Sequence, residues 1–285
     1  MKALNQNLLS EVKQYYGKDK SYIPTIHLED GLYPTMSDFH VPYHLEQTIR
    51  GIAKAYSKKS KGLILLGDIF DVESLSGFKK VGIIPRLLDE YEQGRRLIWD
   101  LAEMFEEIWM IMGNHEYRVL ARTRNVDEIA FLDSFDLLRH IANGDRLYYD
   151  EYNEEAYLLK DSEAPKNIHY YGTSVMIAND ILFAHPMHFS RVYGKTVSNV
   201  ITDYKLELDY NFRACIIGHT HFCVNGLSVG TVMGYEIGCL AKPMKYLRKE
   251  IRKRKTHVGF METYITNGRF DPYRSRVINL SQLID

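Results

Sequence analysis

The sequence has few cysteines and no long apolar run, and each shortage argues against a class of protein. Its 285 residues include three cysteines, none in a C-x-x-C pair. This usage argues against a disulfide framework and favours a reducing, intracellular setting. The N-terminus lacks the apolar stretch of a signal peptide. No segment approaches the roughly 18 apolar residues that a transmembrane helix requires. We therefore expect a cytoplasmic protein.

Net charge is also nearly absent, at −1. The chain as a whole is therefore not attracted to nucleic acid or to anionic membranes, and any such affinity must come from a local patch. No internal repeat, low-complexity tract or Gly/Ser-rich linker divides the sequence. We expect an N-terminal helical extension over residues 1–31 and a single domain over residues 32–285.

Short apolar runs alternate with helical patterns in the first half of the chain. The runs end abruptly at glycine or polar residues, as buried parallel strands do, and lie at 32–38, 62–68 and 107–114. Helical patterns cover 44–59, 84–105 and 126–141. This alternation predicts βαβ units and a largely parallel sheet.

The second half of the chain has a different pattern. Short strand-like runs cover 167–186 and are joined by an Asn-Asp turn. A helical pattern at 196–208 and a strand at 214–221 follow, and two alternating segments flank a turn near the C-terminus. The fold class that we predict is α/β, with two stacked sheets flanked by helices.

Polar side chains gather where the predicted strands end. In open α/β sheets the ligands bind beyond the carboxyl ends of the strands. Five such ends carry carboxylate, imidazole or amide groups: Asp38 and His40; Asp68 and Asp71; Asn114, His115 and Glu116; His185; His219 and His221. Each motif alone is commonplace as a turn, a helix cap or a buried histidine. Together, at one edge of a sheet, they predict a metal site.

The residue types indicate which metals such a site would bind. Mixed nitrogen and oxygen ligands suit Mn, Fe, Zn, Co or Ni better than Ca or Mg. Glycines precede Asp68, Asn114 and His219, where they allow the backbone to approach the ions closely. A carboxylate bridging two groups of ligands predicts two ions about 3.5–4 Å apart, which is the arrangement for in-line phosphoryl transfer.

In chain order, these motifs resemble those of the calcineurin-like metallophosphoesterases, D-x-H, G-D-x-x-D, G-N-H-[DE], a strand-end His and G-H-x-H. Here they read DFH, GDIFD, GNHE, AHP and GHTH, and the resemblance covers roughly residues 32–240. It implies a four-layer α/β/β/α sandwich around a dinuclear centre, with Mn the most expected metal. It assigns Asp38, His40 and His221 to one ion, Asn114, His185 and His219 to the other, and Asp68 to both.

The resemblance also implies the catalytic roles. A hydroxide shared by the ions would be the nucleophile. His115 would lie near the leaving-group oxygen, as a proton donor or as an electrostatic partner of the phosphoryl group. We expect Asp71 to hydrogen-bond His115 and to raise the pKa of its imidazole.

Two positions depart from the family pattern. Ser/Thr protein phosphatases carry Arg after the second Asp of G-D-x-x-D, whereas this chain has Val72. The usual strand-end His-Gly is His-Pro here, and His188 is a second candidate beside His185. The first departure argues against a phosphoprotein phosphatase. The second leaves the identity of one ligand open.

Basic residues near the motifs are candidates for substrate contact. Arg118 follows GNHE, and Arg191 and Lys195 follow the strand-end histidine; each also fits an ordinary solvated surface. The segment 242–257 holds eight Lys or Arg and one Glu. It is either a solvated helix face or a patch that tracks a phosphate backbone, in which case the contacts would come from Lys245, Arg248, Lys249 and Arg252.

Three functions follow from these features. We favour a metal-dependent phosphodiesterase or nuclease acting on nucleic acid or nucleotides, because Val72 replaces the phosphate-gripping Arg and because of the basic segment. The alternative is a phosphomonoesterase acting on a small molecule or a protein. A silent scaffold is disfavoured, since the chain keeps the whole ligand set and His115.

Overall fold

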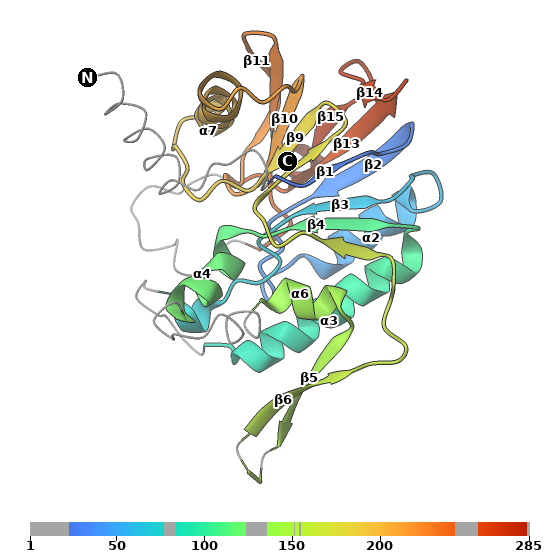
Figure 1. Cartoon of the computed structure of the whole chain (residues 1–285), viewed down its shortest axis with the longest axis vertical. Helices are drawn as coiled ribbons and strands as arrows, with labels where there is room; N and C mark the ends of the chain where they lie inside the picture. The colour runs from blue at the N-terminus through green and yellow to red at the C-terminus, as the bar shows by residue number, and fades with distance from the viewer. Residues whose placement is uncertain are drawn as a thin grey trace, which may run out of the picture.

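The computed structural model describes residues 23–76, 84–123, 136–150, 152–153, 155–242 and 256–283. Two large sheets lie at its centre, with a two-stranded hairpin beside them (Figure 1). The N-terminal helical extension expected over 1–31 and the basic segment expected over 242–257 fall mostly outside the described residues. None of the described helices is both long enough and apolar enough to cross a bilayer.

The first sheet has seven strands and contains the three apolar runs predicted in the first half of the chain. In the order β14-β13-β2-β3-β4-β7, with β15 paired to β13, these strands are Arg269–Phe270, Gly259–Thr266, Gly31–Met36, Leu63–Leu66, Ile108–Ile111, Ile168–Tyr170 and Arg276–Asn279. Pairing is parallel from β2 to β7. The expected parallel sheet is confirmed for that part, while the late strand β13 adds an antiparallel edge.

The second sheet has six strands and mixed pairing. In the order β1-β8-β9-β10-β12-β11, they are Thr25–Ile26, Val175–Ala178, Ile181–Ala184, Ala214–Ile217, Val232–Ile237 and Cys223–Val229. β8 and β9 form an antiparallel hairpin with Asn179 at φ 54° in its turn, as the Asn-Asp pair predicts. The hairpin of β11 and β12 was not predicted.

Alternation along the strands builds the layers. On β3, Leu63 and Leu65 face a core shared with helices, whereas Ile64 faces the other sheet. On β9, Phe183 faces the first sheet, whereas Leu182 packs toward a helix. Because both faces of the central strands are covered, strands such as β3, β9 and β10 are apolar throughout rather than alternating. The expected α/β/β/α order of layers follows from these three cores.

The helices lie on the outer faces of the two sheets. On the first sheet lie α2 (Glu46–Tyr56), α3 (Leu87–Met104) and α6 (Leu137–Ala142), and on the second lies α7 (Lys195–Ile201), continued by the π-helical turn η3 (Thr202–Glu207). Helices were predicted at all four places. Of the expected helix at 126–141, only the part forming α6 falls among the described residues. Asp136 begins α6 by accepting a bond of 3.2 Å from the amide of Arg139.

The remaining elements connect or extend these layers. α4 (Asn114–Thr123) begins inside the GNHE motif, and η2 (Glu73–Leu75) and η5 (Leu280–Leu283) are single turns. β5 (Asp145–Asp150) and β6 (Glu155–Lys160) form the separate hairpin, which projects from the body of the molecule (Figure 1).

Candidate metal centre

The polar residues predicted at five strand ends meet at one edge of the two sheets. Two glycines make this possible because no side chain would fit at their positions. A Cβ on Gly67 would lie 2.3 Å from the amide nitrogen of Gly113, and a Cβ on Gly113 would lie 2.1 Å from Oδ1 of Asp68. The loops after β3 and β4 are therefore packed backbone to backbone, which brings Asp68 beside Asn114.

The backbone at the site is unusual. Nine non-glycine residues of the described chain have positive φ. Five of them are predicted ligands: Asp38, His40, Asp68, His219 and His221. Left-handed backbone costs free energy at residues with a Cβ, and such positions concentrate at functional sites. The loops are held in this shape by bonds such as that from the His40 amide to the Asp68 carbonyl, 3.0 Å.

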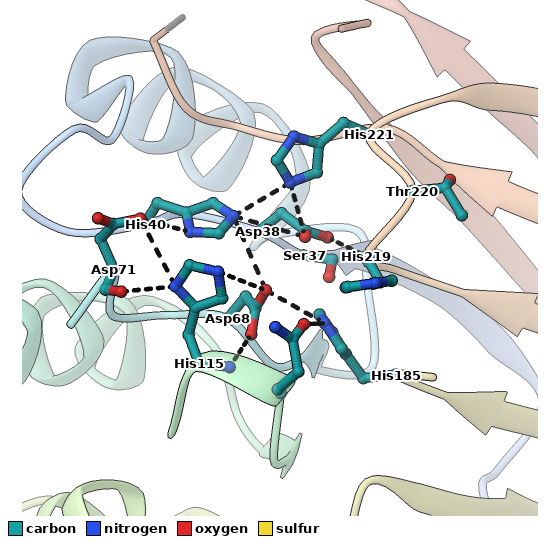
Figure 2. A network of polar contacts seen from close by, with 12 residues as sticks. Ser37, Asp38, His40, Asp68, Asp71, His115, His185, His219, Thr220 and His221 are labelled. Atoms are coloured by element: carbon teal, nitrogen blue, oxygen red, sulfur yellow. Dashed lines mark hydrogen bonds and ion pairs between the residues drawn. The ribbon is translucent and has the colours of Figure 1, made fainter. Parts of the chain in front are cut away.

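The first group of side chains contains Asp38, His40 and His221, all buried. Nε2 of His221 lies 3.0 Å from Oδ1 of Asp38 and 3.1 Å from Nε2 of His40. Figure 2 shows both imidazoles turned toward this carboxylate. The three ligand atoms therefore surround one point, although they come from the loop after β2 of the first sheet and the loop after β10 of the second.

The second group contains Asp68, Asn114, His185 and His219. Nε2 of His185 lies 3.2 Å from Oδ2 of Asp68 and 3.0 Å from Oδ1 of Asn114. Its Nδ1 lies 2.5 Å from the Leu66 carbonyl, which fixes the tautomer and directs Nε2 into the site.

Two features of this group bear on metal binding. Nε2 of His219 is buried without a hydrogen-bond partner, as an empty ligand position would be. His185 is fully buried, whereas its rival His188 is exposed and belongs to no cluster of ligand atoms among the described residues. The geometry therefore favours His185 over His188.

Asp68 stands between the two groups. Its Oδ2 lies 3.2 Å from Nε2 of His185, 3.8 Å from Nε2 of His40 and 3.9 Å from Nε2 of His115. Its Oδ1 accepts a bond of 2.8 Å from the amide of His115. Because one carboxylate faces both groups, it occupies the position that a bridging ligand needs.

The electrostatics of the centre call for cations. Burial alone would lower the pKa of His185, but Asp68 raises it to about 9. Burial is likewise outweighed at His40, where Asp38 and Asp71 raise the pKa to about 10. Burial and the neighbouring His185 lower the pKa of His219 to about 3. Protonated imidazoles thus balance the buried carboxylates where divalent ions would otherwise do so, and the donor set fits two such ions.

The contact between Asp71 and His115 differs from the expected one. Nδ1 of His115 lies 2.5 Å from the backbone carbonyl of Asp71 and 3.5 Å from its carboxylate Oδ1. That Oδ1 is nearer to Nδ1 of His40, at 3.2 Å. Burial, with His40 and Arg118 nearby, lowers the pKa of His115 to about 4 although Asp68 opposes the shift. The charge of Asp71 also acts to raise this pKa, in the expected direction, but burial outweighs it.

Glu116 has a role that the sequence did not reveal. Its Oε2 accepts from the amides of Asp68 and Gly113 at 3.0 and 2.9 Å, and its Oε1 accepts from Phe70 at 2.9 Å. This buried carboxylate ties the loop after β3 to the loop after β4. The available signal was an acidic residue in the first turn of a helix, where free amides lie.

Glu236 supports the other side of the centre. Lying buried on β12, it accepts a bond of 3.1 Å from the Thr220 hydroxyl and one of 3.2 Å from the Val197 amide. The GHTH loop is thereby fixed to the start of α7. No sequence motif indicated this residue.

Of the candidate substrate contacts, Arg118 lies beside the centre. Nη1 of Arg118 donates to the Asp71 carbonyl at 3.3 Å, so its guanidinium is close to His115. Arg191 and Lys195 are exposed on the segment that follows β9. Lys245, Arg248, Lys249 and Arg252 are outside the described residues.

Comparison with known proteins agrees with this centre. The family model of the calcineurin-like phosphoesterases matches residues 35–223, a span that includes every predicted ligand. The chain therefore belongs to the calcineurin-like phosphoesterases and is a metal-dependent phosphoester hydrolase.

Solved structures that match the chain are distant from it in sequence. A metallophosphoesterase from Sphaerobacter thermophilus is 11% identical with a TM-score of 0.43, over 88% of each chain. A dimetal phosphatase from Danio rerio is 9% identical with a TM-score of 0.40, over 88% of this chain and 99% of that one. Vps29 from Chaetomium thermophilum is 9% identical with a TM-score of 0.40, over 83% and 85%. No curated protein matches the chain in sequence.

Proposed function

We propose that the chain is a phosphodiesterase acting on nucleotides or nucleic acid. In this proposal Asp38, His40 and His221 hold one divalent ion, Asn114, His185 and His219 hold the other, and Asp68 bridges them; Mn is the metal that we expect. When bound, such ions supply Lewis-acid stabilisation to phosphoryl oxygens and activate water. The protein supplies the positions of the ligands and the surrounding charge.

The buried side chain at position 72 carries the preference for a diester. Val72 has φ 51° and lies fully buried in the core on the helix side of the first sheet. Its amide donates to Glu90 at 2.8 Å, and its side chain packs in that core rather than in the centre. No cationic side chain therefore stands at the position from which related phosphatases grip phosphate. A diester carries one negative charge at neutral pH, whereas a monoester carries up to two, so a diester depends less on such a group.

His115 is the proposed proton donor to the leaving oxygen. Its imidazole is held through Nδ1 by the Asp71 carbonyl, which leaves Nε2 directed toward Asp68 and the centre (Figure 2). An imidazole fixed at one nitrogen can transfer a proton only through the other. The tautomer set by the carbonyl, with a proton on Nδ1, means that Nε2 must first take up a proton in order to donate one.

A phosphomonoesterase remains the second candidate because of Arg118. Its guanidinium reaches the Asp71 carbonyl and could supply from α4 the cationic contact that Val72 does not supply from its turn. Arg118→Ala should then lower kcat/KM for a phosphomonoester by more than tenfold. The same change should alter diester hydrolysis less.

A metal-supplemented substrate screen tests the proposal directly. The protein is assayed with p-nitrophenyl phosphate, its bis ester, cyclic nucleotides and short DNA or RNA, in Mn²⁺ and in the other candidate metals. Higher kcat/KM for the bis ester and the nucleotides supports the diesterase. Higher kcat/KM for p-nitrophenyl phosphate would instead support the monoesterase.

A polynucleotide substrate has its own test. We propose that Lys245, Arg248, Lys249 and Arg252 contact a phosphate backbone. Neutralising all four should weaken polynucleotide binding and flatten its dependence on salt. Hydrolysis of a small diester should hardly change. Unaltered polynucleotide affinity would leave this segment as a solvated surface.

A further inference from the structure

Large apolar side chains are exposed on the segment that follows β9, directly beside the metal centre. Met187, Phe189, Val192 and Tyr193 are 37, 42, 64 and 51% exposed. We call these four residues the ledge. Several large apolar side chains exposed within seven residues, next to a polar centre, are characteristic of a binding site rather than of a solvated loop.

The ledge touches the GHTH loop at two points. The ring of Phe189 meets the edge of His219, with centroids 5.2 Å apart. The ring of Tyr193 stacks on Phe222 at 4.2 Å, next in the chain to His221. One exposed aromatic ring therefore lies against His219 itself, and a second lies against the residue that follows His221.

Local hydrogen bonds hold the ledge in place. The Ser190 amide donates to the Thr196 hydroxyl at 2.9 Å, and the Val192 amide donates to the Ser190 hydroxyl at 3.1 Å. Tyr193 also packs on His257, at 5.6 Å between centroids, and the His257 amide donates to the His221 carbonyl at 2.8 Å. The exposed rings are thus positioned before any ligand arrives, which reduces the entropy lost on binding.

A cavity of about 410 Å³ opens beside Phe189. Its wall includes His185 of the metal centre and Met187 of the ledge, with the polar side chains of Asn199 and Asp203 farther along. A flat aromatic ligand attached to a phosphate could place the phosphate at the centre and its ring on Phe189. The side chains of Asn199 and Asp203 would then face the polar edge of the ligand's ring.

We infer that the ledge is a nucleobase-binding site, on which Phe189 and Tyr193 stack against the bases of a nucleotide or nucleic-acid substrate. This inference rests on the proposed function, because it requires a phosphoester at the metal centre. Every nucleobase has a π-face, so stacking on aromatic side chains binds bases with little dependence on sequence. A diester also extends on both sides of its phosphorus, so it can reach more than one of the rings along the GHTH loop.

Two ligands that differ only in the base test the inference. Adenosine 5′-monophosphate and ribose 5-phosphate carry the same phosphate on the same sugar. Their inhibition constants against hydrolysis of a small diester, and their dissociation constants by calorimetry, are measured on the Mn-loaded full-length protein. We expect the nucleotide to bind more tightly by at least about fivefold, which is the low end of what one base stack contributes.

Substitutions in the ledge then show which of its rings the base stacks on. A single base stacks on one ring, so at least one of Phe189→Ala and Tyr193→Ala should weaken binding of the nucleotide by about five- to hundredfold, with less than a twofold change for ribose 5-phosphate. Tyr193→Phe and Phe189→Trp keep a ring and should retain most of the preference for the nucleotide. Tyr152→Ala is the matched control, because Tyr152 is 94% exposed at the turn of the distant β5–β6 hairpin.

Two results would overturn the inference. One is equal affinity of the parent protein for the two ligands. The other is a preference for the nucleotide that persists in both alanine variants. Failure of the proposed function would look different, because the parent protein would then hydrolyse no diester. Calorimetry would still measure its preference for the nucleotide and the effect of the ledge variants.

Discussion

Asp68 is the single residue whose position decides whether the centre can hold two ions. Its Oδ2 faces His185 from one group and His40 from the other. Asp68→Ala should therefore remove most bound metal and essentially all activity, whereas His40→Ala should weaken mainly one of the two positions. Elemental analysis of the purified variants measures both effects. Two transition-metal ions per chain in Asp68→Ala would show that Asp68 does not bridge.

His115 makes a prediction about the leaving group rather than the metal. His115→Asn should keep its metal, because the imidazole contributes no proposed ligand. If it donates a proton, the rate for a poor alkoxide leaving group should fall by about 10²–10⁴. The rate for p-nitrophenolate, which departs unaided, should fall much less. Equal losses for both substrates would leave the imidazole with an electrostatic role alone.

Asp71 should behave differently from His115, since its carboxylate is nearer to Nδ1 of His40 than to His115. The carbonyl that holds His115 survives in Asp71→Asn. We expect this variant to lose about 10–100-fold in metal affinity through the poorly oriented His40. Its ratio of rates for good and poor leaving groups should remain that of the parent. A ratio that follows His115→Asn would instead place the Asp71 carboxylate in the proton transfer.

The loops after β3 and β4 pack against each other as one element. A pair of glycine-to-alanine variants, one in these loops and one on a helix, tests that packing. In Gly113→Ala the new Cβ would overlap Asp68, so we expect a loss of about 1–3 kcal/mol in unfolding free energy and a large loss of metal. Gly51 lies on α2 with nothing near its missing Cβ. Gly51→Ala should therefore gain about 0.5–1 kcal/mol.

Urea unfolding and elemental analysis measure both glycine variants. Full metal content in Gly113→Ala would contradict the close packing of the two loops. A loss of stability in Gly51→Ala would contradict the open surroundings of that helix position.

The stability of the whole molecule should depend on pH in a way that metal changes. Without metal, the folded state raises the pKa of His40 to about 10 and of His185 to about 9, above the ordinary 6.5. The protons on His40 and His185 therefore contribute their full stabilisation of the fold below about pH 6.5. This stabilisation is lost as the pH rises through 9–10. His219 and His115 have lowered pKa values and are neutral in both states over that range, so they do not offset the loss.

Thermal melting with and without metal measures this effect. The metal-free protein should lose stability from about pH 6.5 upward. The metal-loaded protein should not, because metal binds neutral imidazole and is favoured as pH rises. The difference in Tm between the two forms should therefore grow between pH 6.5 and 9. A constant difference would mean that protons and metal do not compete for His40 and His185.

The sequence by itself determined the layers and the set of polar strand ends. Apolar runs such as Leu63–Leu66, each followed by a glycine and a ligand-type side chain, indicate buried strands. This signal can be read from the sequence because it depends only on neighbouring residues. The rule that ligands bind at the carboxyl ends of strands then brings Asp38, Asp68 and Asn114 together without coordinates. What was missed in the fold, such as the β11–β12 hairpin, lies where apolar alternation is weak.

Only the tertiary structure decided how those side chains are supported. The turn of the Asp71 carboxylate toward His40 and the three amides bound by Glu116 depend on residues far apart in the chain. The ledge likewise becomes a candidate site only because Phe189 folds onto His219. Local patterns record which face of an element is buried, whereas the partner that a buried polar group finds is set by packing between elements.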